Sequence, residues 1–272
     1  GLEREVRLSL PAESIVSLAP SNTEILFAID AGEQVVARDS FSDYPAEAQE
    51  VTDIGGGWGE IDTETILSLE PDLVLAAEIN ALEQIEQLED LGLTVFYLAN
   101  PADLEGMLAN LYIVAQLTGR EEETLALMDD LGARIAAVDD IVSNAEERPV
   151  VFYELDGTDP NAPWTSGPGT FIDLLVARAG GENLGNVLAD AWAQISVEEL
   201  ITQNPEVILL GDYIWGGVTP EDVAARAGWD VIAAVQNDQV YPFDDNLVSR
   251  PGPRMVDGLE KIAKILHPEL FQ

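Results

Sequence analysis

The chain has 272 residues, more than one compact core usually holds, so two domains or one large domain are expected. Its 12 Lys and Arg against 51 Asp and Glu give a net charge of −39, which excludes binding to nucleic acid or anionic membranes because both need neutralising cations. A sequence without cysteine forms no disulfide, and one histidine, His267, is too few for a zinc, copper or iron site.

The acidic composition indicates adaptation to salt. In molar salt the Debye length falls to ~3 Å, so repulsion among the carboxylates is screened. The composition resembles that of a protein from a salt-loving archaeon. No apolar run reaches the ~20 residues that span a bilayer. No signal peptide is recognisable at Gly1, so we expect either an intracellular protein or a mature chain whose leader has been removed.

The first predicted elements alternate between strand and helix. Ser21 with Glu24 predicts a capping box at the start of one helix. Asn100 and Pro101 predict the start of a later helix, as N-cap and first helical residue. Between and around them the patterns predict strands at 14–18, 35–37, 72–76 and 93–98, and helices at 63–69 and 80–91.

A long amphipathic helix is predicted next, over 120–146, because apolar residues recur every three or four positions without a proline. About 25 helical residues extend roughly 38 Å. The strand and helix pattern then restarts. Ser196 with Glu199 predicts one capping box, and Thr219 with Pro220 predicts another helix start. The remaining predicted elements are strands at 149–155, 206–210 and 239–243, a helix at 170–179 and a final helix that ends at Leu266.

One segment of the chain is repeated. IDTETILSLEPDLVLAAE (61–78) has a near twin in ISVEELITQNPEVILLGD (195–212), at an offset of 195 − 61 = 134 residues. The repeat predicts an α/β fold of two Rossmann-like lobes with mainly parallel sheets and a ligand cleft between them, lined by the loops that follow the strands. We assign 1–118 to the N-terminal lobe, 119–147 to a linking backbone helix and 148–272 to the C-terminal lobe, whose last helix can pack back between the lobes.

Aromatic side chains gather in these loops, several of them beside glycine. Each ring could hold its loop against its own lobe, but rings flanked by glycine also suit a large, flat or greasy ligand. A scaffold without a ligand is disfavoured by three tryptophans in such loops. We predict ligand contacts from Tyr44, Gly57 and Trp58 in the first lobe and from Trp164, Tyr213 and Trp215 in the second, with Phe41 and Phe171 as further rings of these loops.

The segment DDNLVSRPGPR (244–254) adds polar groups. Its two arginines could simply pair with the neighbouring acids. Alternatively, Arg250, Asp245 and Asn246 present fixed donors and acceptors to the polar rim of a ligand, and this is our prediction. Arg38 is the other cation that we expect to face the cleft.

Motifs for catalysis are missing from the sequence. IGGGWG (54–59) lacks the Lys-Ser/Thr of a phosphate loop, and TSGPG (165–169) is not a nucleophile elbow. His267 follows the last predicted helix, where we interpret it as structural. We therefore predict a binding protein without catalytic residues, metal site or cofactor. An enzyme that uses carboxylates in the cleft is the remote alternative.

Segments in order along nearly the whole chain, among them IVSLAPSNTEILFAIDAGEQVVA, WTSGPGTFIDLLVARAGGENL and SRPGPRMVDGL, resemble ABC-transporter substrate-binding proteins of the helix-linked (class III) kind. SNTEILFAIDAG and SDYP are most similar to the vitamin B12 binders. The resemblance implies a monomer at the cell surface, held by a lipid or N-terminal tether, that carries a corrinoid (cobalamin or cobinamide) to a permease dimer. Haem or a ferric siderophore is the alternative ligand, which the few cations expected in the cleft disfavour.

The resemblance also implies docking residues. Members of this family meet their transporter through one surface glutamate on each lobe. In the B12 binders the glutamate follows an Asn-Ala pair, but here Leu82 occupies that position. We therefore predict Glu83 in the first lobe, with Glu78 as its alternative, and Glu221 in the second.

Overall fold

The computed structural model describes residues 5–57 and 59–271. The chain divides into two compact units. Unit 1 comprises Gly1–Gly132 and Arg250–Pro253, and unit 2 comprises Ala133–Ser249 and Arg254–Gln272. The backbone thus passes from one unit to the other after residues 132, 249 and 253. Among the described residues, no helix has both the length and the apolar character needed to cross a membrane.

Unit 1 is built on a parallel five-stranded sheet in the order β3-β2-β1-β4-β5. The central strands β1 (Ile15–Ser17) and β4 (Leu73–Ala77) are buried at every position, as expected for a parallel sheet covered on both faces. The other elements are β2 (Val35–Arg38), β3 (Thr52–Asp53), β5 (Val95–Leu98), α1 (Pro20–Ala28), α2 (Thr63–Ser68), α3 (Leu82–Asp90), α4 (Leu104–Thr118), η1 (Gly32–Gln34) and η2 (Ala46–Glu50).

Unit 2 contains a mixed sheet in the order β11-β10-β6-β7-β9, with β8 also paired to β6. Strands β6 (Val150–Asp156), β8 (Glu182–Asn183), β10 (Val207–Leu210) and β11 (Val240–Pro242) are parallel, whereas β7 (Trp164–Ser166) and β9 (Trp192–Gln194) are antiparallel additions. Its helices are α6 (Phe171–Arg178), α7 (Val197–Gln203), α8 (Tyr213–Gly216), α9 (Pro220–Ala224), α10 (Ala233–Gln236), α11 (Asn246–Ser249) and α12 (Met255–Leu266), with η3 (Leu184–Val187), η4 (Trp229–Val231) and η5 (Pro268–Phe271). The predicted class, two α/β lobes with mainly parallel sheets, is confirmed.

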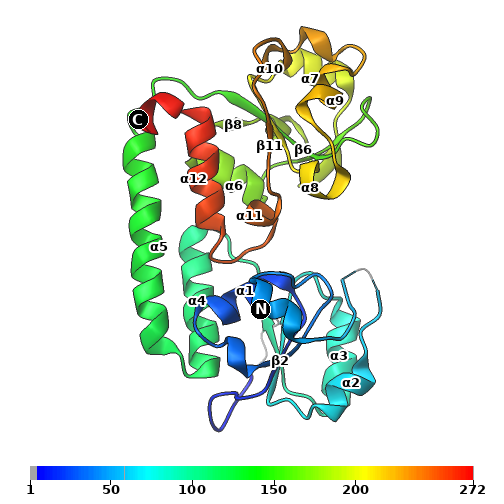
Figure 1. Ribbon diagram of the computed structural model, residues 1–272, viewed down its shortest axis with the longest axis vertical. Helices are drawn as coiled ribbons and strands as arrows, with labels where there is room; N and C mark the ends of the chain where they lie inside the picture. Colours follow the sequence, from blue (N-terminus) through cyan, green and yellow to red (C-terminus); the bar gives the residue numbers. More distant parts are fainter. Residues whose placement is uncertain (1–4, 58, 272) are drawn as a thin grey trace. The chain divides into compact units, whose positions relative to one another are not determined.

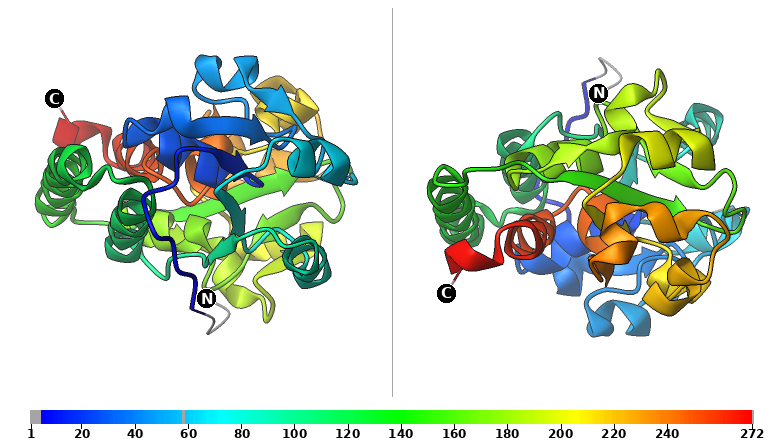
Figure 2. Two further views of the ribbon diagram at one scale, coloured as in Figure 1. Left: turned by 90° about the horizontal axis from the view of Figure 1, so that it is seen from below. Right: turned by 90° about the horizontal axis from the view of Figure 1, so that it is seen from above.

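Helix α5 (Glu121–Val142) contributes to both units as one continuous helix (Figure 1). Its 22 residues extend roughly 33 Å, somewhat less than predicted. In unit 2 it lies beside α12 (Figures 1 and 2). Arg134 of α5 joins the two helices, with Nη2 2.5 Å from Asp257 Oδ1 and Nε 2.8 Å from Glu260 Oε1.

The repeated segment folds in the same way in both units. Asp62 caps α2 by accepting a hydrogen bond from Thr65 N, and Ser196 caps α7 by accepting one from Glu199 N, at the same offset of 134 residues. The chain then leaves each helix through a residue with positive φ, Glu70 at 46° and Asn204 at 49°. Proline follows in both copies, and each copy ends in a buried strand.

Two predicted helix starts are wrong, and a third is right only in part. Helix α1 begins at Pro20 without a side-chain cap, because proline itself suits the first helical position, so Ser21 is not its N-cap. Helix α4 is capped by Asp103 and not by Asn100. Ser196 does cap α7, but the Glu199 carboxylate accepts from Gln203 instead of completing a capping box. Helix α9, by contrast, begins at Thr219-Pro220 as predicted, and Thr219 forms a full capping box with Asp222.

Candidate ligand-binding loops and their buried supports

The loop after β2 carries the candidate rings of unit 1. Phe41 and Tyr44 are 42% and 46% exposed. Gly57 has a φ of 65°, and a Cβ at this position would lie 2.0 Å from the Phe41 ring, so no other residue fits there without moving that ring. Trp58, the third predicted residue of this unit, lies outside the described residues. Gly57 thus has a structural reason to be glycine, and its contact with a ligand stays a prediction.

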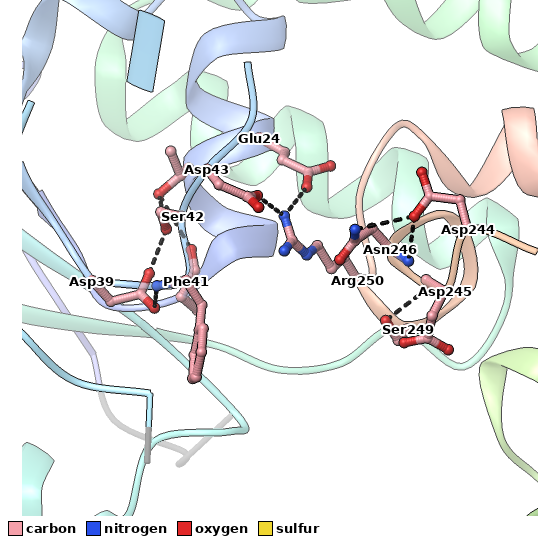
Figure 3. Close-up of polar contacts among 12 residues, drawn as sticks. Glu24, Asp39, Phe41, Ser42, Asp43, Asp244, Asp245, Asn246, Ser249 and Arg250 are labelled. Atoms are coloured by element: carbon pink, nitrogen blue, oxygen red, sulfur yellow. Dashed lines mark hydrogen bonds and ion pairs between the residues drawn. The ribbon is translucent and has the colours of Figure 1, made fainter. Parts of the chain in front are cut away.

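A buried carboxylate supports this loop. Asp39 is 1% exposed and accepts hydrogen bonds from Phe41 N at 3.0 Å and from Ser42 Oγ (Figure 3). Ser42 Oγ also lies 2.7 Å from Thr23 Oγ1 of α1. Burial raises the pKa of Asp39, and the hydrogen bond from Ser42 opposes this rise. A chain of buried polar groups therefore fixes the backbone from which the two rings project.

Arg250 has different partners from those predicted. Its Nη1 lies 3.0 Å from Glu24 Oε1 and 2.7 Å from Asp43 Oδ1, both within unit 1 (Figure 3). The Glu24 side chain is 1% exposed, so Arg250 neutralises a buried charge. The interpretation that Arg250 pairs with the neighbouring acids is wrong. A direct contact between Arg250 and a ligand stays a prediction. Such a ligand would have to bind Arg250 beside these two carboxylates or displace one of them.

Arg38 is a structural residue and not a cation of the ligand site. It is 8% exposed and donates to the carbonyl oxygens of Ala48 and Asp39, each at 2.9 Å. Its Nη1 lies 3.4 Å from Asp53 Oδ2. The expectation that Arg38 faces a ligand is therefore wrong.

Unit 2 presents more exposed rings. Trp164 at the start of β7 is 41% exposed, and α8 carries Tyr213 at 42% and Trp215 at 61%. The two rings of α8 are only two residues apart on one short helical turn that directly follows β10. These three predicted residues are therefore accessible to a ligand.

Trp192 in β9 was missed by the sequence interpretation. It is 49% exposed and pairs with Ser166 across the antiparallel ladder, while Trp164 pairs with Gln194. Trp164 and Trp192 consequently occupy diagonal positions on one face of the sheet, within reach of each other for large side chains. No glycine flanks Trp192, but the alternation over 192–194 was a usable signal of a strand with an exposed ring.

A second group of buried charges supports the loops of unit 2. Arg226 bonds the buried Glu154 through two contacts of 2.5 and 2.8 Å, and its guanidinium lies 4.5 Å above the Trp229 ring. Asp212, 1% exposed, precedes α8 and accepts a hydrogen bond from Gly157 N at 2.8 Å. Burial raises the pKa of both carboxylates, and Arg226 opposes the rise at each. These charges fix the backbone on either side of Tyr213 and Trp215.

The predicted polar groups Asp245 and Asn246 have partners within unit 2. Tyr153 donates its hydroxyl proton to Asp245 Oδ1 at 2.8 Å, and burial raises the pKa of Tyr153. Asn246 Nδ2 donates to Asp244 Oδ1 at 3.0 Å (Figure 3). Both side chains are partly exposed, and their contact with a ligand stays a prediction.

The predicted docking glutamates are accessible. Glu83 lies in the first turn of α3, and Glu221 lies in the first turn of α9. Both are exposed, as is the alternative Glu78, which accepts a hydrogen bond from Asn100 N at 3.2 Å. Glu83 also lines a groove of about 480 Å³ together with Glu60, Gln84 and Gln87.

The histidine and the acidic residues do not form a metal site in the described part of the chain, where no group of three potential ligands comes together. His267 is 4% exposed at the end of α12, and its Nε2 lies 3.3 Å from the Gly180 carbonyl oxygen. It packs in the interior of unit 2, as its structural interpretation required.

Two α/β units share one long helix, and each presents exposed rings close in sequence to its sheet strands, which is the arrangement of a two-lobed binding protein. The chain belongs to the periplasmic binding protein family, whose model matches residues 15–247. A family of substrate-binding proteins has no catalytic role, so the predictions of this family and of a protein that is not an enzyme are confirmed.

Relatives along the whole chain agree with this assignment. An uncharacterized ABC transporter substrate-binding lipoprotein of Bacillus subtilis, YvrC, is 31% identical over 99% of this chain and 84% of its own length. A cobalamin-binding protein of Halobacterium salinarum is 27% identical over 96% of this chain and 71% of its own. The chain is therefore the extracytoplasmic substrate-binding component of an ABC importer.

Two solved structures, whose names state different ligands, are about equally similar to this chain. The vitamin B12-binding protein BtuF of Vibrio cholerae has a TM-score of 0.81 and 27% identity, covering 96% of this chain and 99% of BtuF. The heme-binding protein RhuT of Roseiflexus sp. RS-1 has a TM-score of 0.84 and 28% identity, covering 95% and 99%. These likenesses fix the class of protein but leave both ligand types open.

Proposed function

We propose that the protein captures a corrinoid, cobalamin or cobinamide, outside the cytoplasm and delivers it to the permease dimer of an ABC importer. The main support is the similarity to a haloarchaeal cobalamin-binding protein over 96% of the chain. The exposed tryptophan and tyrosine rings supply the flat apolar surfaces that suit a corrin ring. The cobalt corrinoid is cargo, and we expect no resident cofactor.

Haem is the second candidate, because a heme-binding protein is similar over 95% of the chain. Protein-bound haem iron usually takes an axial ligand from His, Cys, Met or Tyr. His267, Met107 and Met255 are buried, and the sequence has no cysteine, so Tyr44, Tyr213 or the partly exposed Met128 would have to serve. Cobalamin carries its own nucleotide base as a lower ligand, which makes the corrinoid the better match to these side chains.

The ligand is tested by fluorescence titration in molar KCl with cobalamin, cobinamide, haem and a ferric siderophore. We expect saturable quenching by a corrinoid at the lowest concentration. Trp215→Ala should weaken binding about tenfold or more, because each tenfold corresponds to about 1.4 kcal/mol. Leu91→Ala, which removes another exposed apolar side chain, is the control. Tighter binding of haem, with an absorbance shift lost in Tyr44→Phe or Tyr213→Phe, would refute the corrinoid.

Delivery is tested separately from capture. We propose that Glu83 and Glu221 meet arginines of the permease, with Glu78 as the alternative to Glu83. Because exposed ion pairs are screened in brine, recognition there depends on close bidentate contacts. Reversal of Glu83 and Glu221 to arginine should abolish uptake and leave ligand affinity intact, while Glu86→Arg on the same helix as Glu83 should be tolerated. Normal transport by the double variant would exclude this pair.

The mode of attachment is part of the same proposal. A binding protein that serves an importer has to stay near the membrane, and one relative is named a lipoprotein. We propose a lipid or N-terminal tether and a monomeric chain. Membrane fractionation of the natively expressed protein, before and after detergent extraction, tests the tether, and light scattering tests the monomer.

A further inference from the structure

The lysines of this protein are few and lie together. Only Lys261 and Lys264 occur among 272 residues, both on α12. The other described cations are arginines, each with a hydrogen bond, ion pair or electrostatic partner. Neither lysine forms an ion pair within residues 5–57 and 59–271, although the chain has about four acids for every cation. Lys264 interacts electrostatically with Glu260, but neither ammonium group is held by a close ion pair, so both can contact an external partner.

Both lysines line a groove of about 440 Å³ in unit 2, which we call the lysine groove. One wall consists of Tyr241 and Pro242 of β11, and the other is the face of α12 from Asp257 to Ile265. Lys261 and Lys264 are three residues apart on this helix, so their side chains start roughly 5–6 Å apart on the same face. Each ammonium has three donors, and two such groups can converge on one small ligand.

The two acidic residues of the groove share one arginine. Arg134 contacts Asp257 at 2.5 Å and Glu260 at 2.8 Å, so these two carboxylates do not compete fully for the lysines. Three cations therefore face two carboxylates at this place, in a chain whose net charge is −39. Lys261 Nζ lies 4.8 Å above the Phe243 ring, a cation–π contact that restricts the side chain while leaving its donors available.

We propose that the lysine groove binds a small tetrahedral oxyanion with at least two negative charges, of which phosphate is the type, through both ammonium groups. The overall field of this acidic chain repels anions, so binding must arise from short contacts at the groove. A dianion with several acceptor oxygens is favoured over chloride, which carries a single charge on one atom. This site is independent of the proposed corrinoid function.

The scarcity of lysine makes a direct test possible. Reductive methylation with ¹³C-formaldehyde keeps the positive charge, and within residues 1–272 it labels Lys261 and Lys264 in addition to the free terminal amine of the protein used. Lys261→Arg and Lys264→Arg assign the lysine signals by removing one signal each. Phosphate is then exchanged for KCl at constant ionic strength in the full-length protein, and sulfate is titrated in parallel.

We expect both lysine signals to shift with a common saturating midpoint, without a parallel shift of the terminal amine. In the unmethylated protein, ³¹P line broadening should show that Lys261→Gln and Lys264→Gln each weaken binding about fivefold or more. Arg7→Gln, which removes an exposed cation in unit 1, should have no effect. The proposal is overturned if the shifts do not saturate, if the terminal amine shifts equally, or if either glutamine variant binds phosphate as the wild type does.

Discussion

Glu78 and Asp212 end the two copies of the repeated segment, 134 residues apart, yet their environments are opposite. Glu78 is exposed and accepts a hydrogen bond from Asn100 N. Asp212 is 1% exposed and accepts one from Gly157 N. The same helix, turn and strand thus lead to a surface carboxylate in unit 1 and to a buried one in unit 2.

The neighbouring strand differs in the same way. Leu75 pairs with Ser17 in unit 1 and its counterpart Leu209 pairs with Tyr153 in unit 2, so the next residues, Leu18 and Glu154, are equivalent. Leu18 is a buried apolar side chain, whereas Glu154 is a buried charge that depends on Arg226. The same backbone conformation is therefore stabilised by different interactions in the two units. In unit 2 the ends of the strands depend on the guanidinium of Arg226.

Removing that guanidinium should have the largest effect. Arg226→Ala leaves Glu154 and Asp212 as buried acids without their cation, so we expect a loss of about 3–5 kcal/mol in the free energy of unfolding. Denaturant unfolding in molar KCl measures this loss. Arg7→Ala, at an ion pair whose side chains are 80% and 72% exposed, should change the value by less than about 1 kcal/mol. Equal effects of the two variants would contradict the comparison.

Replacing the whole Glu154–Arg226 ion pair by apolar residues should remove this difference between the strand ends of the two units. Glu154→Leu with Arg226→Met gives unit 2 the apolar strand end that Leu18 provides in unit 1. Replacing a buried ion pair by apolar residues of similar size is often neutral or stabilising. The double variant should therefore regain at least half of the stability lost in Arg226→Ala. No recovery would mean that the pair also determines the conformation of this part of unit 2.

The buried hydrogen bonds that join Thr23, Ser42 and Asp39 in unit 1 should be the next most sensitive feature. Ser42→Ala removes a donor to the buried Asp39 and a partner of Thr23, and we expect a loss of about 1–3 kcal/mol. Ser40→Ala removes an exposed contact to Asp53 in the same loop and should cost clearly less. Thermal unfolding of both variants tests this order. A larger loss in Ser40→Ala would show that the buried chain is not the main support of the loop.

The two helix caps should behave alike. Asp62→Ala and Ser196→Ala remove the equivalent hydrogen bonds that Thr65 N and Glu199 N donate, and loss of a cap costs about 1 kcal/mol. Asp62→Ala also removes the hydrogen bond from the exposed Thr65 hydroxyl, which should add little. Their losses are compared under identical conditions by denaturant unfolding. A difference of more than about 1 kcal/mol would show that the equivalence of the two copies does not extend to the start of the helix.

The pH dependence of Asp212 should give the smallest effect. Burial raises the pKa of Asp212 in the folded protein above 3.8. As the pH rises past 3.8, the unfolded chain therefore loses this proton before the folded protein does. The contribution of Asp212 to the free energy of unfolding falls until the pH has passed the raised pKa of the folded state. Asp212→Asn should therefore gain stability relative to wild type as the pH rises above 3.8, and denaturant unfolding at a series of pH values measures this gain. Glu78→Gln, at the equivalent exposed position, is the control for the loss of a carboxylate in general. A difference between Asp212→Asn and wild type that stays constant with pH would contradict the prediction.

Local patterns in the sequence predicted the fold well where the interacting residues are close along the chain. The repeat located α2, α7 and the two strands that follow them, and Thr219 with Pro220 located α9. Helix starts were misplaced where two candidate caps competed within a few residues, as with Asn100 and Asp103. Such choices depend on which backbone amides remain unpaired, which residue types alone do not reveal.

The candidate site was harder to predict because its polar groups have distant partners. The Arg250 to Glu24 pair joins residues 226 positions apart, and no local pattern indicates it. The exposure of Trp164, Tyr213 and Trp215 followed from their loop context, but Trp192 lacked the glycine that had marked the other rings. Arg38 was misassigned because a charged residue at a strand end was expected to face a ligand, whereas backbone carbonyl oxygens bind it.

The segment Arg250–Pro253 has a consequence for the order in which the protein is completed during synthesis. It belongs to unit 1, although every other residue of that unit precedes residue 133. Until Arg250 has been synthesised, the buried Glu24 of unit 1 has no access to its guanidinium. Unit 1 therefore reaches its final set of contacts only after β11 of unit 2 has been synthesised. The part of the protein that leaves the ribosome first is still incomplete when most of unit 2 has been made.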